Sequence, residues 1–455
     1  MAIIPIQNKY PDRAGYLGLD TDRNVLVGMS DGILQDMTNS TPEGWVNIKD
    51  LGAKGDGIHD DTAVFQQCLG QNNVNIYIPN GTYLISDTII VYSNINVLGE
   101  SWNTIILCTE SGRFRMAHRN QLKFSNFTIS SFNFDKSSRA YSKRFDFIYC
   151  DNLTFNHINF ENINGYSIYS AFTQNLTIKN CNFYNAGIWY VRLAETTGRF
   201  MHNKMYADID FENDYFVYQL FNSHMLYFDN ESENCGIGST STAGQGTFGL
   251  TYIIGGGRAI LDSNVDRNPL VSNFGFASHS YNCKAVNNDF TSRPGCHCFW
   301  IETSGSKQHI VSNNTFHTGL FLVGSSNGGD NVIISNNFFL DVDDIYIDFH
   351  PDCRVATFTN NVVSFLTEHE FVINSANKNN TDVQIIISNN RFFNAKAIVR
   401  VYNIIGVGTI YNHLVTNNII ISTSTVPIGI LHAGSTTLEN CIENNNIFVQ
   451  HTVGE

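Results

Sequence analysis

The chain has 455 residues, of which 42% are hydrophobic, 13% aromatic and only 15% charged, and its formal net charge is −14. Apolar side chains are numerous enough to build a large core, which excludes an intrinsically disordered chain. The acidic balance argues against a nucleic-acid-binding protein, because such proteins carry a basic surface.

No apolar run is long enough to cross a bilayer, so we expect no membrane insertion. The first residues, Met1 to Gln7, lack a cationic segment followed by a long apolar one, and we expect no secretory signal. The ten cysteines form no CxxC pair, and their only cluster is Cys296-His297-Cys298. Because a zinc site needs four ligands, the sequence predicts buried reduced thiols, with no metal and no cofactor.

Residues 1–45 differ from the rest of the chain. The segment from Gly15 to Asp22, followed by Val25 to Gly28, resembles the small β-hairpin units that precede β-helices in phage tail proteins. The resemblance implies a segment that binds a phage tail or baseplate, in a homotrimer located in the virion. We therefore expect a domain boundary after residue 45.

The next segment carries a second resemblance. The stretch from Val46 to Gly57, followed by Asp60-Asp61-Thr62-Ala63, is similar to the opening of the pectate-lyase-like β-helix superfamily. The resemblance implies a right-handed parallel β-helix, and it implies little about the reaction.

In that family, the stretch matching Asp61 to Leu69 is a short helix that caps the solenoid. The residues agree with this, because Asp60 or Asp61 can serve as N-cap and apolar side chains follow at helical spacing. We expect Ala63, Phe65 and Leu69 to meet the core. The two aspartates are therefore predicted to be caps and turn residues rather than catalysts.

A short motif with two Asn residues, one variable residue and an apolar residue returns about every 25 residues over most of the chain. Clear copies end at Phe183, Phe290, Phe316, Phe339, Val363, Phe392, Ile420 and Ile447. Each interval holds short β-rich segments, which cannot close a core alone and must stack on their neighbours. Asn suits a left-handed turn, and stacked Asn side chains can bond one another. Residues 46–455 are therefore predicted to be all-β, a single-stranded right-handed parallel β-helix (solenoid) with a short N-terminal capping helix.

One strand per coil follows each motif, and four of these strands suggest a working face. Aligned, they begin at Phe299, Phe321, Ile345 and Phe371, and alternation points these residues inward. The outward positions are predicted to be Trp300, Leu322, Tyr346 and Val372, followed by Glu302, Gly324, Asp348 and Asn374. In an earlier coil, Tyr190 and Arg192 are expected on the same outward face.

Glu302 and Asp348 are the predicted catalytic pair. They lie two coils apart, roughly 9–10 Å between backbones, with Gly324 leaving a notch between them. That separation suits an inverting glycoside hydrolase, in which one carboxyl is the acid and the other the base for water. Trp300, Tyr346, His350, Arg192 and Tyr190 are the predicted substrate-binding residues. A solvated acidic column without a role is the alternative.

The leading hypothesis is a phage tailspike-type depolymerase that hydrolyses a bacterial capsular or exopolysaccharide. The alternatives are a polysaccharide lyase in which His350 or Tyr346 abstracts a proton, a fructan-cleaving transferase, and a non-catalytic receptor-binding tail protein. Polygalacturonase-like enzymes carry a Gly-His-Gly motif, which this sequence lacks. The alternating acidic residues Asp208 to Asp214 could line a groove, bind a cation or form a solvated edge.

Overall fold

The structure is a computed structural model, and it describes most of the chain from residue 41 to residue 450, together with three strands nearer the N-terminus. The described ranges are 16–20, 25–30, 33–36, 41–135, 142–185, 189–208, 215–220, 222–234, 250–267, 272–276, 280–292, 297–301, 307–323, 330–349, 355–370, 372–377, 384–411, 413–423 and 427–450.

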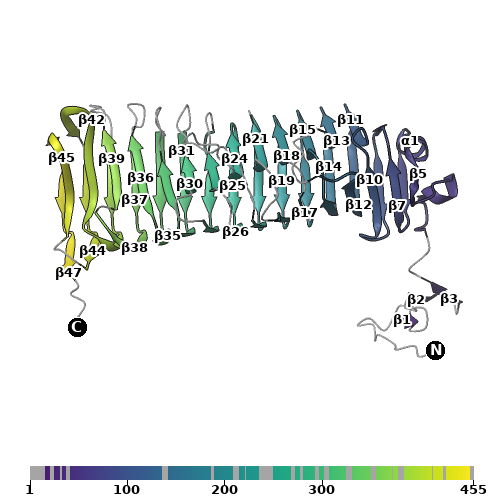
Figure 1. Ribbon diagram of the computed structural model, residues 1–455, viewed down its shortest axis with the longest axis horizontal. Helices are drawn as coiled ribbons and strands as arrows, with labels where there is room; N and C mark the ends of the chain where they lie inside the picture. The colour runs from purple at the N-terminus through teal and green to yellow at the C-terminus, as the bar shows by residue number, and fades with distance from the viewer. Residues whose placement is uncertain are drawn as a thin grey trace.

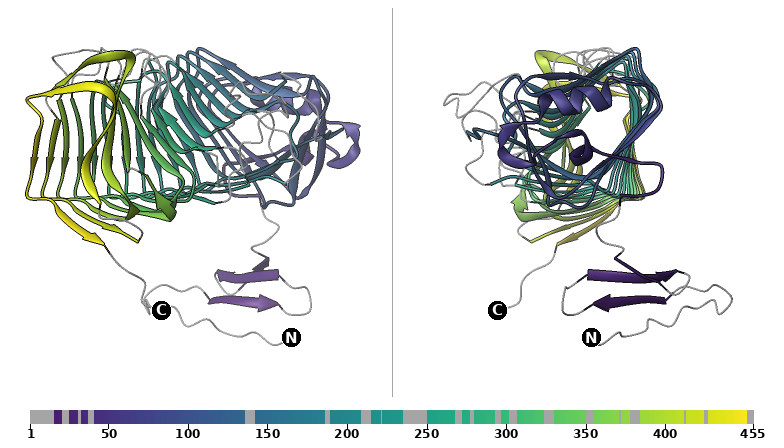
Figure 2. Two further views of the ribbon diagram at one scale, coloured as in Figure 1. Left: turned by 60° about the vertical axis from the view of Figure 1, so that its left-hand side comes forward. Right: turned by 90° about the vertical axis from the view of Figure 1, so that its right-hand side faces the viewer.

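The chain winds into a parallel β-solenoid whose coils stack along one long axis (Figure 1). Seen along that axis, the strands form three walls around the core (Figure 2). Two of the walls belong to one 30-stranded sheet, because the long strands β12 and β14 run through both, and the third is a 14-stranded sheet. All pairings within the walls are parallel, which confirms the predicted fold class.

The first ladder comprises β4 (Val46–Asn47), β6 (Val74–Ile78), β9 (Ile95–Gly99), β12 (Asn120–Ser131), β14 (Asp151–Glu161), β16 (Leu176–Lys179), β19 (Thr197–Met201), β22 (His224–Phe228), β25 (Arg258–Asp262), β28 (Lys284–Val286), β31 (Lys307–Ser312), β34 (Asp330–Ser335), β37 (Val355–Thr359), β40 (Gln384–Ser388), β43 (His413–Thr416) and β46 (Ile442–Asn444).

The second ladder shares β12 and β14 and further comprises β5 (Asp56–Asp60), β7 (Gly81–Ile85), β10 (Thr104–Cys108), β17 (Asn182–Tyr184), β20 (Lys204–Tyr206), β23 (Glu231–Glu233), β26 (Val265–Arg267), β29 (Asp289–Thr291), β32 (Thr315–His317), β35 (Phe338–Val342), β38 (Val362–His369), β41 (Arg391–Ala395), β44 (Ile419–Ser422) and β47 (Ile447–Gln450).

The third ladder comprises β8 (Thr88–Ile90), β11 (Arg113–Ala117), β13 (Lys143–Ile148), β15 (Tyr166–Ala171), β18 (Trp189–Ala194), β21 (Tyr215–Leu220), β24 (Leu250–Gly255), β27 (Ser272–Phe276), β30 (His297–Ile301), β33 (Leu320–Val323), β36 (Asp344–Phe349), β39 (Ile373–Asn377), β42 (Ala397–Tyr411) and β45 (Ile428–Glu439).

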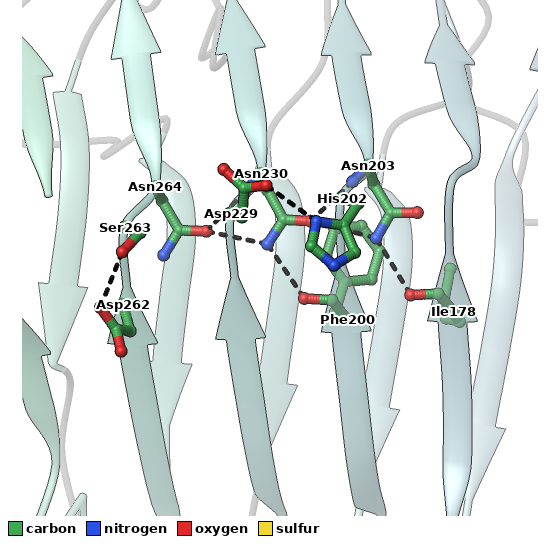
Figure 3. Close-up of polar contacts among 9 residues, drawn as sticks. All are labelled: Ile178, Phe200, His202, Asn203, Asp229, Asn230, Asp262, Ser263 and Asn264. Carbon is green, nitrogen blue, oxygen red and sulfur yellow. Dashed lines mark hydrogen bonds and ion pairs between the residues drawn. The ribbon is translucent and has the colours of Figure 1, made fainter.

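The Asn motif forms the turn between the first and second ladders. Its first residue is left-handed, as at Asn313 (φ 58°) and Asn336 (φ 57°), a conformation that Asn tolerates. Its second residue is buried, and its side-chain amide bonds the equivalent Asn of the next coil (Figure 3). This Asn ladder runs through Asn203, Asn230, Asn264, Asn288, Asn314, Asn337, Asn361, Asn390, Asn418 and Asn446. The predicted turn and its stacked amides are confirmed.

From Phe183 to Ile420, the apolar residue that ends each motif points into the core, where the rings of successive coils pack. Phe316 and Phe339 stack with ring centroids 5.1 Å apart. The last copy was placed one residue early, because Phe448 rather than Ile447 pairs with Ile420. The extra Asn in Asn444-Asn445-Asn446 made the copy ambiguous, and the ladder contact of Asn446 resolves it.

The predicted capping helix is present as α1 (Thr62–Leu69), which covers the N-terminal end of the solenoid (Figure 2). Phe65 and Leu69 enter the core as expected, but the third buried residue is Cys68, and Ala63 is exposed. Asp61 occupies the N-cap without capping through its side chain, because its carboxylate accepts the backbone N–H groups of the preceding turn, at Lys54 and Gly55.

A 3-10 helix, η1 (Ile48–Leu51), precedes β5, and its Ile48 belongs to the core. Nearer the N-terminus, β1 (Tyr16–Asp20), β2 (Val25–Ser30) and β3 (Ile33–Asp36) form an antiparallel sheet, as the hairpin resemblance implied. The assembly role of residues 1–45 stays a prediction. Cysteines in the described ranges are free thiols, and all but the half-buried Cys441 are buried.

Candidate active site on the third ladder

The strands predicted to carry the site are neighbours in the third ladder. Phe299 pairs with Phe321, which pairs with Ile345, and the column of Ile301, Val323 and Ile347 follows the same register. These two inward columns match the predicted alignment. Glu302 directly follows Ile301 in the sequence, and Asp348 directly follows Ile347.

The predicted catalytic pair is only partly visible. Glu302 and His350 lie outside the described residues, and for Tyr346 and Asp348 the structure describes the backbone in β36 but not the side chains. Asp348 pairs with Ala376 in the next coil. The roles proposed for these four residues therefore stay predictions.

Trp300 is buried, with 5% of its surface exposed. It is absent from the core cluster, which contains both of its neighbours, Phe299 and Ile301. Alternation along β30 accordingly points Trp300 outward, as predicted, but other residues cover it. Its ring does not offer the open face that was expected for stacking on a sugar.

The predicted register of the fourth strand is wrong by two residues. Ile345 pairs with Ile373 instead of Phe371, and Tyr346 pairs with Asn374 instead of Val372. Val372 was expected to face outward, yet it is fully buried in the core. Two apolar residues in succession, Val372 and Ile373, both enter the core where the chain turns into β39, and simple alternation does not allow for such a corner.

Tyr190 was also expected to face outward, and that prediction is wrong. Its ring is fully buried in the core and packs against Phe183, while its hydroxyl donates to the carbonyl of Tyr206. Arg192, by contrast, lies on the outer side of β18, half-buried, with its guanidinium 5.3 Å from the ring centroid of Tyr169. Strand β18 thus alternates from Val191 onward, after a corner at Tyr190.

Arg192 belongs to a group of charged and aromatic side chains on the outer side of the third ladder. Pairing of β11, β13, β15 and β18 sets four of them in one column, and Lys143 joins them from the start of β13. We call this group the Tyr169 cluster: Arg115, Lys143, Asp146, Tyr169 and Arg192.

Contacts within the Tyr169 cluster are close. Lys143 Nζ lies 3.5 Å from the ring centroid of Tyr169 and 3.3 Å from Oδ1 of Asp146. Lys143 comes from the coil before Tyr169 and Arg192 from the coil after it, so the ring has a cation on each side. The alternation Lys143-Arg144-Phe145-Asp146-Phe147 could have revealed the outward Asp146, but the sequence reasoning began at the Asn motifs and missed it.

Asp344, at the start of β36, is a second residue that sequence reasoning missed. Burial raises the pKa of its carboxyl, only partly opposed by the positive charge of His369. Among the described residues no hydrogen-bond partner reaches its buried Oδ1. Because a raised pKa favours the protonated carboxyl, Asp344 is a candidate proton donor on the same strand as Asp348. In the sequence, Asp344 lies in an Asp-rich stretch of the kind that is common in turns, so it does not stand out as an acid.

Two cavities lie away from the predicted pair. One of about 640 Å³ lies between the second and third ladders, with Glu110 and Asp135 in its lining. Buried Arg144 also lines it, and the guanidinium donates to the carbonyls of Thr109 and Gly112 at 2.8 and 2.9 Å. Arg144 thus holds the turns of neighbouring coils together, and its burial lowers its pKa.

The other cavity, of about 260 Å³, lies beside the Asn ladder. On its rim His202 Nδ1 lies 2.8 Å from Asp229 Oδ2, next to Asn203 and Asn230 (Figure 3). Within the described part of the chain, no group of three or more His, Cys, Asp or Glu side chains is placed to hold a metal ion. In those same ranges, no helix is long and apolar enough to cross a membrane.

Of the acidic stretch from Asp208 to Asp214, only Asp208 is described. Its carboxylate accepts hydrogen bonds from the hydroxyl of Tyr184 and the side-chain amide of Asn185. Asp208 therefore supports a turn, and the other acidic residues of that stretch lie outside the described residues.

Comparison with known proteins agrees with this architecture. Residues 45–248 match a family model described as rhamnogalacturonase A/epimerase, pectate lyase-like. A glucan 1,3-beta-glucosidase of Cochliobolus carbonum is 27% identical over 148 residues, which cover 28% of this chain and 19% of that protein. A non-secreted LysM effector, LysM15, of Penicillium expansum is 39% identical over 74 residues, 13% of this chain and 5% of that protein. The chain thus matches only a small part of its curated relatives.

Among solved structures, the N-terminal fragment of bacteriophage phi29 gene product 12 superposes with a TM-score of 0.51 at 16% identity, covering 87% of this chain and 72% of that one. A likeness at this identity concerns the fold alone. The chain is thus a right-handed parallel β-helix, and over residues 45–248 it resembles the pectate-lyase-like family.

Proposed function

We propose that the protein is a polysaccharide-active enzyme, a depolymerase that hydrolyses glycosidic bonds of a bacterial capsular or exopolysaccharide. The match of residues 45–248 to a rhamnogalacturonase and epimerase family supports action on a polysaccharide, as does the likeness to a glucan glucosidase. The solenoid offers a long outer surface along the third ladder, which suits an extended polymer better than a small molecule.

The observation that carries the proposal is the register of Ile301, Val323 and Ile347 in adjacent strands. If β30 continues in this register, Glu302 and Asp348 lie on either side of Gly324, two strand spacings apart. Two spacings are roughly 9–10 Å, which leaves room for one water molecule between the two carboxyl groups.

In the proposed reaction, Glu302 protonates the leaving glycosidic oxygen. Asp348 removes a proton from a water molecule that attacks the anomeric carbon from the opposite face, and the bond to the leaving oxygen breaks. Burial raises the pKa of Asp344, which is the candidate acid if Glu302 does not protonate the leaving oxygen. His350, Tyr346 and Arg192 are proposed to bind the sugar.

We further propose that the protein is a homotrimeric tailspike of a phage virion, attached through residues 1–45. The hairpin of β1 and β2 and the fold likeness to a bacteriophage protein support this role.

The decisive experiment measures reducing-end release and ultraviolet absorbance together on a panel of bacterial capsular polysaccharides. Wild type is compared with Glu302→Gln and Asp348→Asn, with Asp289→Asn, on the second ladder, as the matched control. Reducing ends without absorbance, lost in both site variants and kept in the control, would support the hydrolase and its pair.

Other outcomes reassign the function. Ultraviolet-absorbing products would indicate an unsaturated sugar and hence a lyase. Full activity in both site variants would refute the pair. Binding of a capsular polysaccharide without any product would favour a non-catalytic receptor-binding protein.

A further inference from the structure

Three aromatic rings stack on the surface at the turn that follows the third ladder. His118, Tyr149 and Phe172 come directly after β11, β13 and β15, so they lie on successive coils. The centroids of His118 and Tyr149 are 5.0 Å apart with planes at 7°, and those of Tyr149 and Phe172 are 4.6 Å apart with planes at 12°. We call these three residues the turn stack.

The rings of the turn stack are exposed, and their residues have an energetically unfavourable backbone conformation. Tyr149 and Phe172 remain 49% and 40% exposed, although large apolar rings are usually buried. All three residues are left-handed, with φ of 55°, 53° and 52°, a region that bulky side chains rarely occupy. The Asn motif shows that the same fold uses Asn where a turn needs this conformation. Exposed rings at strained positions are typical of a binding surface.

A buried apolar cluster lies beside the turn stack. Ala171, Ala194 and Leu220 pack into a separate apolar cluster on the outer side of the third ladder, with Ile148 and Tyr169 against it. Pairing of β13, β15, β18 and β21 puts the first three in one column with Ile148. This column lies between the turn stack and the Tyr169 cluster, so the two groups are neighbours on the same wall of the solenoid.

The Tyr169 cluster carries a positive charge, whereas the whole protein is acidic. The Tyr169 cluster holds three cations, Arg115, Lys143 and Arg192, and a single carboxylate, Asp146. The chain as a whole has a net charge of −14. Arg119, which stacks on Tyr92 at 4.4 Å, adds another cation next to His118. A local excess of cations favours an anionic ligand.

We propose that the turn stack and the Tyr169 cluster form a binding track for an acidic polysaccharide. Because the facing planes of these rings already stack on one another, sugars would contact the exposed edges of Tyr149 and Phe172. The carboxylates of the polymer would pair with Lys143, Arg192 and neighbouring cations. The proposal rests on the proposed function insofar as the same polymer would reach the predicted catalytic pair. Strand β30 lies five ladder steps from β15, roughly 24 Å along the axis, so the track would hold the polymer several sugars away from the cleaved bond.

The test is affinity electrophoresis of the full chain in native gels that contain polygalacturonate, alginate, dextran or a β-1,3-glucan. The main variant is Tyr149→Asn with Phe172→Asn, because Asn is tolerated in the left-handed conformation and the fold should be kept. Lys143→Gln with Arg192→Gln tests the charge. Phe338→Ala removes a 50% exposed ring on the second ladder and is the matched control.

We expect retardation by the two acidic polymers and none by the neutral ones, with affinity about tenfold lower in the Asn double variant. The Gln double variant should lose the salt dependence of binding, and Phe338→Ala should bind as wild type. The proposal would be overturned if neutral polymers bound equally well or if no polymer bound. It would also be overturned if Phe338→Ala weakened binding as much as the Asn double variant does.

The proposed function fails separately. In one case no polysaccharide is cut, but the wild type still binds acidic polymers and the Asn double variant does not. The binding track is then supported and the proposed hydrolase activity is refuted. If a polysaccharide is cut by the Asn double variant with an unchanged KM, the hydrolase stands and the track is refuted.

Discussion

The side-chain amide of Asn314 donates to Oδ1 of Asn337 across 3.0 Å, and its second N–H donates to the carbonyl of Ala285 in the preceding coil at 2.9 Å. The Oδ1 of Asn337 also accepts the backbone N–H of Asn314. Each buried Asn thus satisfies polar groups of both neighbouring coils, which explains why the residue recurs at this position: no apolar side chain could bond these turn groups.

Removing one side chain of the Asn ladder should therefore destabilise the solenoid. Asn337→Ala leaves two donors of Asn314 and the carbonyl of Val311 without partners in a buried turn. We expect the free energy of unfolding to fall by roughly 3 kcal/mol, measured by urea denaturation. Asn336→Ala is the control, since Asn336 is exposed and should cost only about 1 kcal/mol for its left-handed backbone. Equal losses in the two variants would contradict the role of the ladder.

His309 should make the fold sensitive to acid. Its ring is fully buried, stacks on Phe276 and lies within 3.3 Å of the backbone N–H of Cys283, and burial lowers its pKa from 6.5 to about 3. Because the folded pKa is depressed, its contribution to stability is present above pH 6.5 and is lost as pH falls towards 3, by up to about 1.4 kcal/mol per pH unit.

His309→Gln keeps an acceptor for the N–H of Cys283 and does not titrate. Wild type should lose more stability than this variant between pH 6.5 and pH 4, as measured by urea denaturation at several pH values. Parallel pH profiles for the two proteins would mean that His309 is not the group that responds.

The sequence was sufficient to predict the fold, because the Asn motif reports a local requirement that every coil repeats. A left-handed turn and a buried amide need the same residues each time, so Asn313-Asn314 and Asn360-Asn361 stand out without any knowledge of the packing. The third ladder has no such constraint. Its strands begin after turns of different length, and the predicted register therefore slipped by two residues at Ile373.

Side-chain direction was predictable inside strands and failed at their ends. Alternation correctly gave Arg192 and Trp300 an outward direction, whereas Tyr190 and Val372 sit where the chain rounds a corner and both enter the core. Exposure could not be predicted either. Trp300 faces outward and is nevertheless buried, while Tyr149 and Phe172 lie half-exposed at left-handed turn positions.

Asp344→Asn should stabilise the protein at neutral pH. Because burial raises the folded pKa of this carboxyl above 3.8, its contribution is fully present below that pH, when it is protonated, and is lost as pH rises through the folded pKa. Asn resembles the neutral form at every pH. The melting temperature of the variant should exceed that of wild type at pH 7, and the two should converge below pH 4.

The control is Asp341→Asn, since Asp341 lies exposed near the end of β35 with a left-handed backbone that Asn also tolerates. It should leave the melting temperature nearly unchanged at both pH values. A stabilised fold with lower activity in Asp344→Asn would indicate that the buried carboxyl is kept for its chemistry. A less stable variant at pH 7 would show that the ionised form is favoured instead.

The stereochemistry of the product tests the proposed pair. Strands β30 and β36 are separated by β33, so their backbones lie about 9–10 Å apart, a separation that favours a water molecule over direct attack by a carboxylate. The newly released reducing end should therefore have the anomeric configuration opposite to that of the cleaved bond, as read by proton NMR within minutes of mixing. Asp348→Asn should abolish the signal, and Asp289→Asn should leave it intact. Retention of configuration would require two carboxyl groups only about 5 Å apart, and Glu302 and Asp348 could not then be acid and base.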